Sequence, residues 1–137
     1  MGRRILLQAT CALPLVALAL RLFGFARVYA ALGRWTGRAR PPANRLSWVE
    51  GTRHLIRYLA ENGPYRGNCL SQSLVLWWLL RRRGIEADLR FGVRTEAGQL
   101  HAHAWVEYEG LPLNAPGQVR QYVPFDQAIL PDGARFP

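Results

Sequence analysis

The chain has 137 residues, half of them hydrophobic. That length and composition suit one folded domain with a hydrophobic core and exclude a disordered polymer. The formal net charge is +9, but the positive charge is concentrated at one end, because residues 1–45 contain eight arginines and no acidic residue. Most aromatic residues lie inside apolar runs rather than among basic residues, which argues against a nucleic-acid-binding protein.

Residues 1–40 are predicted to form an apolar helical arm flanked by arginines. Ile5–Leu20 is almost wholly apolar but short for a membrane-spanning helix, which needs about 20 apolar residues. Apolar residues continue at helical spacing as far as Leu32, so we expect the arm to dock on the rest of the protein. A helix lying on a membrane surface through residues 5–32, a membrane anchor and a cleaved signal peptide are the alternatives. Pro14 is expected to kink or divide the helix.

Residues 45–137 are predicted to form the main domain, after a Pro- and Arg-rich linker at 37–44. Helical periodicity predicts one helix from residue 46 to about residue 61 and a second, more apolar helix from Cys69 to the stop at Gly84. Asn68 is a good N-cap for this second helix. Alternating apolar residues then predict strands over 87–93, 100–108, 111–114 and 121–125, with tight turns at 96–98 and 109–110. This order predicts an α+β fold, with the second helix laid against one face of an antiparallel meander.

The two cysteines, Cys11 and Cys69, do not make a disulfide framework, and neither belongs to a Cys-x-x-Cys pair. We therefore expect reduced thiols in a cytoplasmic protein, with Cys11 packed among apolar neighbours. Cys69 differs because it opens a predicted helix. Unpaired N–H groups and the helix dipole at that position favour a thiolate and can stabilise a developing oxyanion.

A nucleophilic cysteine needs a base from another part of the chain, and His103 is the candidate. It lies in the middle of the second predicted strand, and an antiparallel hairpin can return it to the start of the Cys69 helix. A third residue must orient the imidazole, and Asn114 can lie beside the ring because it ends the neighbouring strand. Glu107 shares the sheet face of His103 but is about 13 Å along the strand. Asp126 is the other alternative, depending on the course of the last strand.

Two further histidines are open to other interpretations. His101 shares a face with His103 and, together with Cys69, suggests a metal site. Zinc needs three or four ligands, and no further cysteine or suitably spaced acid is evident, so we expect no metal. His54 is expected to face solvent from the first helix of the domain.

The main domain resembles the lasso-peptide leader peptidases, a bacterial branch of the transglutaminase-like cysteine peptidases. The resemblance covers about residues 45–125. It is carried by Cys-Leu-x-x-Ser-Leu at 69–74, Leu-Leu-Arg-Arg-Arg-Gly-Ile at 79–85, Gly-Val-Arg at 92–94 and Ala-His-Ala-Trp-Val-Glu at 102–107.

The resemblance implies a transglutaminase- or papain-like core and a Cys–His–Asp/Asn triad that removes the leader peptide from a precursor. Cys69 and His103 match the family's nucleophile and base directly, whereas the family often has an aspartate where this chain has Asn114. The implied partners are the leader–core precursor, a separate leader-recognition protein and a lasso cyclase, with no cofactor. An acyltransferase or transglutaminase-type enzyme using the same residues, and a non-catalytic scaffold that presents a precursor to a cyclase, are the alternatives.

Overall fold

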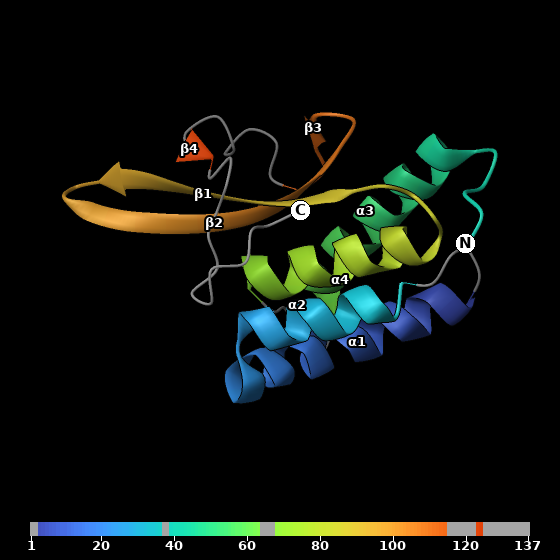
Figure 1. The fold of residues 1–137 in the computed structure, drawn as a ribbon, viewed down its shortest axis with the longest axis horizontal. Coiled ribbons are helices and arrows are strands. Elements are labelled where there is room, and N and C mark those ends of the chain that lie inside the picture. The colour runs from blue at the N-terminus through green and yellow to red at the C-terminus, as the bar shows by residue number, and fades with distance from the viewer. Residues whose placement is uncertain (1–2, 37–38, 64–67, 115–122, 125–137) are drawn as a thin grey trace.

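The computed structural model describes residues 3–36, 39–63, 68–114 and 123–124 of the chain. The helices are α1 (Arg3–Phe23), α2 (Phe25–Arg34), α3 (Arg45–Asn62) and α4 (Cys69–Arg82). The strands are β1 (Asp88–Glu96), β2 (Gln99–Tyr108), β3 (Leu111–Pro112) and β4 (Val123–Pro124). Helices followed by an antiparallel sheet confirm the predicted α+β class (Figure 1).

Helix α4 is the centre of the fold. It lies between the sheet on one side and the pair α1 and α2 on the other (Figure 1). Eight of its residues are buried: Ser71, Ser73, Leu74, Val75, Leu76, Trp77, Leu79 and Leu80. The core is continuous from α1 through α4 to the sheet, because buried residues of all these elements belong to one hydrophobic cluster. The apolar composition of the α4 sequence is therefore explained by contacts on nearly every side.

Local signals set both ends of α4. The Asn68 side chain accepts a hydrogen bond from the Ser71 backbone N–H at 2.9 Å, and the Ser71 hydroxyl accepts one from the Asn68 N–H at 3.0 Å. This reciprocal pair is a capping box, which fixes the first turn of the helix. After α4, Gly84 adopts a φ of +74°, and a side chain there would lie 2.2 Å from the Ala39 carbonyl oxygen. Glycine is therefore required where the linker crosses the end of the helix.

Helix α1 is continuous through Pro14, so the expected division of the helix there is wrong, whereas the kink stays a prediction. The proline lies on the exposed side of α1, while the opposite side packs on the core through five residues: Ile5, Ala9, Ala12, Leu13 and Val16. This packing involves residues on both sides of Pro14 and supports the helix despite the lost backbone hydrogen bond. The chain divides instead at Gly24, which has a φ of +82°. Cys11 is exposed, contrary to the expectation that it is packed.

The sheet has the strand order β3-β2-β1-β4, with every pair antiparallel. The first three strands form the predicted meander, and β4 returns to the other edge to pair with β1. Both tight turns have two residues of positive φ, at Ala97–Gly98 and Glu109–Gly110. That backbone matches the right-handed twist of a hairpin, which confirms the turn predicted at 109–110. Strand β3 is shorter than predicted and ends before Asn114.

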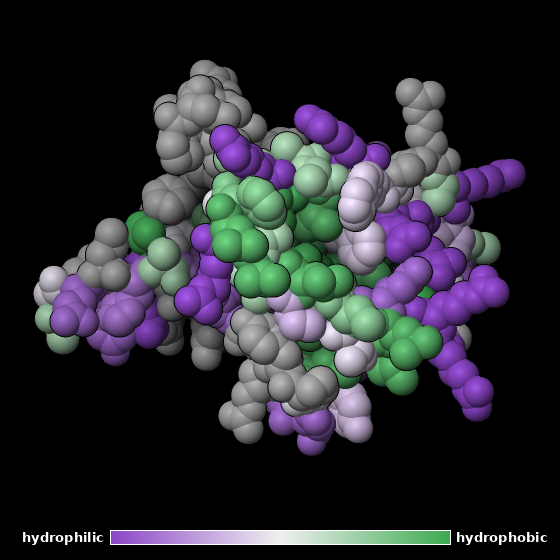
Figure 2. Space-filling view, turned by 90° about the horizontal axis from the view of Figure 1, so that it is seen from below, coloured by the Kyte–Doolittle hydropathy of each residue, from purple (hydrophilic) through white to green (hydrophobic). Residues whose placement is uncertain are grey.

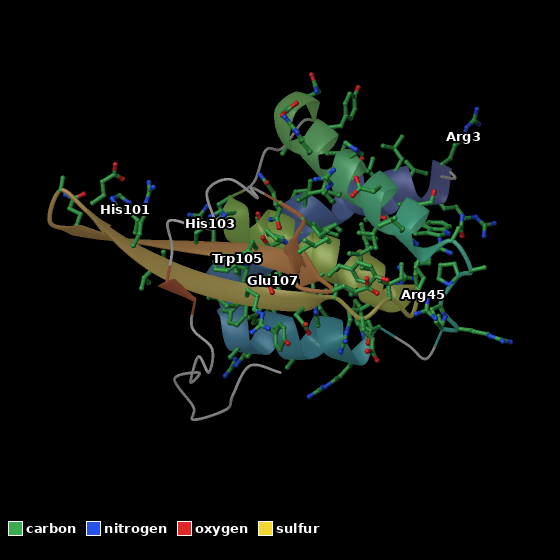
Figure 3. The ribbon with its side chains drawn as sticks, turned by 90° about the horizontal axis from the view of Figure 1, so that it is seen from above. Arg3, Arg45, His101, His103, Trp105 and Glu107 are labelled. Atoms are coloured by element: carbon green, nitrogen blue, oxygen red, sulfur yellow. The ribbon has the colours of Figure 1, made fainter. Side chains whose placement is uncertain are left out.

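The long β1–β2 hairpin has two different faces. Pairing of Leu89 with Val106 and of Phe91 with Ala104 places these apolar residues on the side of the core. The other side of β2 presents His101, His103, Trp105 and Glu107, which follow one another along the strand (Figure 3). The hairpin tip extends past the helices (Figure 1).

Candidate active site

One cleft brings together the three residues predicted to form the site. It has a volume of about 410 Å³ and is lined by Cys69 from α4, His103 from β2 and Asn114 from the segment after β3. As predicted, the β1–β2 hairpin therefore places His103 in the same cleft as the first residue of the Cys69 helix. The apolar part of the cleft is formed by Ile56, Leu76 and Leu113.

Cys69 is the first residue of α4 and is partly buried. The capping box uses the Ser71 N–H, and the backbone N–H groups at this end of the helix have no partner four residues earlier within it. The Cys69 side chain therefore starts from the helix end that carries the partial positive charge of the dipole. The same dipole favours the negative oxygen that forms when a thiolate attacks a carbonyl group.

His103 is partly buried in the middle of β2. Its ring stacks on the ring of Trp105, with the centroids 6.1 Å apart and an interplanar angle of 19°. Burial lowers the pKa of His103 below the usual 6.5, and the positive charge of Arg94 lowers it further. The imidazole is therefore neutral at pH 7, which is the form that can accept a proton from a thiol.

Asn114 is a structural link between the sheet and α4. Its side-chain oxygen accepts a hydrogen bond from the Val106 backbone N–H at 2.8 Å, and its side-chain nitrogen donates to the Ser73 hydroxyl at 2.8 Å. The Ser73 hydroxyl in turn donates to the Ala104 carbonyl at 3.0 Å. These bonds fix the backbone of β2 on both sides of Trp105 against the first two turns of α4. Asn114 is therefore positioned to act on His103 through the strand, and its predicted role in orienting the imidazole stays a prediction.

A family model described as the transglutaminase-like superfamily matches residues 12–126. The chain belongs to the transglutaminase-like superfamily. This superfamily includes cysteine peptidases and acyltransferases, both of which require a reactive thiol and a base. Comparison with curated proteins and with solved structures finds no match. The matched residues begin inside α1, so the second half of α1 and the whole of α2 fall within the family's region.

The other site candidates of this transglutaminase-like domain lie in different surroundings. Glu107 accepts a hydrogen bond from the Trp105 indole at 3.0 Å and pairs with Arg90 at 3.4 Å, and it does not line the cleft. His101 is exposed towards the hairpin tip (Figure 3). Asp126 lies outside the described residues. Within the ranges that the structure describes, no three residues of the types His, Cys, Asp and Glu are grouped to hold a metal.

One wall of the cleft was not identified from the sequence. Polar residues of α3 form it, among them Arg53, Arg57 and Glu61. His54 also lies on this wall and is exposed, as expected. Gln72 lines the cleft one helical turn after Cys69. Its spacing of three residues from the cysteine is the signal that could have placed this amide beside the thiol.

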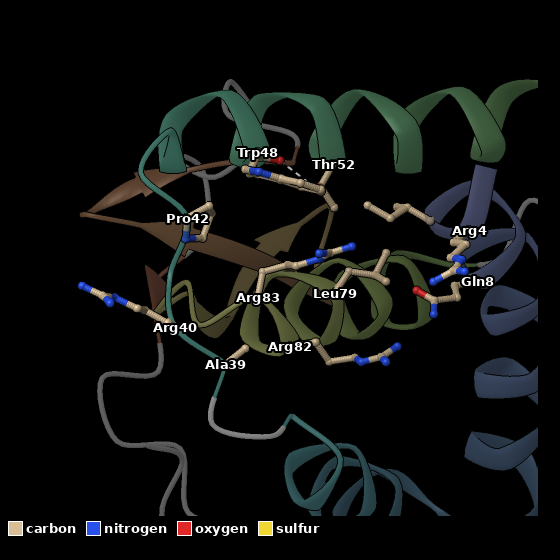
Figure 4. Close-up of a pocket in the computed structure, with 11 residues that line it drawn as sticks. Arg4, Gln8, Ala39, Arg40, Pro42, Trp48, Thr52, Leu79, Arg82 and Arg83 are labelled. Atoms are coloured by element: carbon tan, nitrogen blue, oxygen red, sulfur yellow. Dashed lines mark hydrogen bonds between the residues drawn. The ribbon is translucent and has the colours of Figure 1, made fainter. Parts of the chain in front are cut away.

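A second cleft of about 360 Å³ lies at the opposite end of α4 (Figure 4). Arg4, Arg40, Arg82 and Arg83 are among the residues that line it. Among the described residues, its lining contains no cysteine, histidine or acidic residue, so these residues offer neither a thiol nucleophile nor an imidazole or carboxylate base. The cleft at Cys69, in contrast, contains both a cysteine and a histidine.

Proposed function

We propose that this protein is a cysteine peptidase that removes the leader peptide from a lasso-peptide precursor. The observation that carries the proposal is that Cys69, at the start of a helix, shares one cleft with His103, whose imidazole is neutral at pH 7. Membership of the transglutaminase-like superfamily supports a thiol-based acyl-transfer reaction. The assignment to lasso-peptide leaders rests on the sequence motifs around Cys69, Arg81–Arg83 and His103.

The reaction proceeds in two halves. His103 takes the thiol proton of Cys69 as the sulfur attacks the carbonyl carbon that ends the leader, and the oxygen of that carbonyl becomes negative. N–H groups at the start of α4 stabilise this oxygen. The C–N bond breaks, His103 gives its proton to the departing amine of the core peptide, and the leader remains as a thioester on Cys69. Water, deprotonated by His103, then releases the leader as a carboxylic acid and restores the thiol.

A separate leader-recognition protein fits this small domain. The cleft is small, and among the described residues it is lined by parts of α3 and α4 together with His103, Leu113 and Asn114. We propose that the recognition protein supplies the binding energy that holds the precursor in place, because proximity lowers the entropic cost of the reaction. The released core peptide then passes to the cyclase.

The test is to incubate the protein with a leader–core precursor, with and without the recognition protein, and to determine product masses. We expect a leader with a free carboxylate and a core with a free amine, formed faster when the recognition protein is present. A leader joined to an added amine would indicate an acyltransferase instead. Intact precursor under both conditions, from a protein with its native circular dichroism spectrum, would contradict the proposal and favour the scaffold.

A further inference from the structure

Helix α1 has apolar residues on both of its sides. One side packs on the core, as described above. The opposite side carries a stripe of exposed residues spaced four, four, three and four positions apart, namely Leu7, Cys11, Leu15, Leu18 and Leu22. The four leucines of this outer stripe are between 53% and 66% exposed. A helix on the surface of a water-soluble domain normally presents polar residues on this side.

The outer stripe belongs to a wider apolar surface. Leu6 and Phe23 on the same helix are also exposed, at 43% and 59%. Figure 2, which views the molecule from the side of α1 and α2, shows a broad apolar area bordered by hydrophilic side chains. Exposed apolar area of this kind marks a binding surface for a partner or a membrane.

The charges around the stripe favour an anionic partner. Arg3, Arg4 and Arg21 are exposed at its two ends, and Arg27 and Arg34 are exposed on the neighbouring α2. No acidic residue occurs before Glu50 in the sequence. In an anionic membrane surface, acyl chains lie beneath negatively charged headgroups. The apolar side chains of the stripe can contact the acyl chains, and the flanking arginines can contact the headgroups.

The packing of α1 against the core favours a helix that lies on the membrane surface over a helix that spans the membrane. In the part of the chain that the structure describes, α1 is the one helix long and apolar enough to cross, and 28% of its most apolar window is buried inside the protein. Crossing would remove Ala9, Ala12, Leu13 and Val16 from the core that they share with α4. Lying flat keeps this core intact and brings only the outer stripe into the lipid.

We propose that the outer stripe of α1 docks the protein on the surface of an anionic phospholipid bilayer, with α1 parallel to the membrane plane. The domain stays in water, attached through the opposite side of the same helix. This inference is independent of the proposed peptidase activity, because it concerns a surface formed by α1 rather than the cleft at Cys69.

Vesicle flotation of the full-length protein tests the proposal. The vesicles are phosphatidylcholine alone or phosphatidylcholine mixed with phosphatidylglycerol. We expect binding to the anionic vesicles, weaker binding to the neutral ones, and a decrease with added salt. Arg21→Gln should weaken binding about fivefold. The triple variant Leu7→Gln, Leu15→Gln, Leu18→Gln should weaken it at least about tenfold. These leucines are exposed, so circular dichroism should be unchanged.

Leu111→Gln is the matched control, because Leu111 is 68% exposed but lies in β3. It should bind vesicles like the parent protein. A fluorophore sensitive to polarity on Cys11, in a Cys69→Ser background, should shift to shorter emission wavelengths on anionic vesicles. Failure to float, binding unaffected by the triple substitution, or a dimer in solution that the triple variant dissociates without any vesicle binding would each overturn the proposal.

Discussion

The two ends of helix α4 carry opposite kinds of residue. Its first turn has Cys69 and the Asn68 cap and opens into the cleft shared with His103. Its last turn has Arg81 and Arg82, followed by Arg83, and the Arg82 and Arg83 guanidinium groups lie over the rings of Trp78 and Trp48 at 4.8 and 4.5 Å. Figure 4 shows the arginine-lined cleft at this second end.

The difference follows from the direction of the helix. The partial positive charge at the start of a helix favours an anion such as a thiolate, and the partial negative charge at its end favours cations. The start of α4, at Cys69, therefore suits a negatively charged reaction intermediate, and its end suits the arginine side chains. The two ends are about 20 Å apart, given a rise of about 1.5 Å per residue. We therefore expect the first end to determine reactivity and the second end to contribute to stability.

The largest effect is expected at the first end. Cys69→Ala should abolish cleavage of the precursor, because no sulfur remains to accept the acyl group. Cys11→Ala is the matched control, since it removes the other thiol from an exposed position on α1, and it should cleave within a few-fold of the parent. Cleavage is followed by mass spectrometry of the products. Cleavage retained by Cys69→Ala would show that the comparison assigns the chemistry to the wrong place.

A smaller effect is expected where the sheet joins α4. Asn114→Ala removes two hydrogen bonds and leaves the Val106 N–H unpaired, which should lower the free energy of unfolding by about 2 kcal/mol. Cleavage should slow about 10–100-fold, because the strand that carries His103 loses its support. Urea unfolding and precursor cleavage measure the two effects.

Ser73→Ala separates the two possible roles of Asn114. It breaks the same link from the side of α4, at a residue that does not line the cleft. If Asn114 acts through the strand, Ser73→Ala should slow cleavage in the same way. The loss of transition-state stabilisation in the double variant should then be smaller than the sum of the losses in the two single variants. A loss of cleavage in Asn114→Ala without any loss in Ser73→Ala would instead show that Asn114 contacts the imidazole directly.

The pH dependence tests the base. Because the pKa of His103 is lowered from 6.5, kcat/KM should fall on the acid side only below pH 6.5, as the imidazole becomes protonated. Arg94→Gln removes one of the two causes, so the acid limb should move up towards 6.5. Arg90→Gln is the control on the same face of β1 and should leave the limb in place. Equal shifts in both variants, or no shift in Arg94→Gln, would argue against His103 as the titrating base.

The smallest effect is expected at the second end of α4. Arg83→Ala removes the contact with Trp48 and should lower the free energy of unfolding by about 0.5–1 kcal/mol, with the cleavage rate unchanged. Arg45→Ala, at another exposed arginine, should change the stability less. A slower reaction in Arg83→Ala at unchanged stability would mean that the second end takes part in function.

Local sequence signals predicted the framework of the site well. Asn68 and Gly84 mark the ends of α4 through their own backbone geometry, and Glu109–Gly110 specifies a hairpin turn. These features depend on neighbours in the sequence, so they can be recognised without a structure. The hairpin then brings His103 to the cleft of Cys69 by topology alone.

Features that depend on distant packing could not be predicted. Asn114 bonds to Ser73, 41 residues away, so its position in the sequence does not reveal that its amide is already engaged. Pro14 lies within a continuous helix whose two halves both have buried residues, and this packing is not visible in the local sequence. The α3 wall of the cleft likewise depends on how α3 lies beside α4, which no local pattern specifies.

The most direct test of the account is to trap the intermediate on Cys69. The protein, its recognition partner and precursor are mixed, quenched in acid at short times and measured as intact protein and as peptides. We expect a transient mass increase equal to the leader minus water, located on the peptide that contains Cys69 and absent from Cys69→Ala. An adduct on another residue, or cleavage at the parent rate with no adduct on Cys69 at any time, would contradict it.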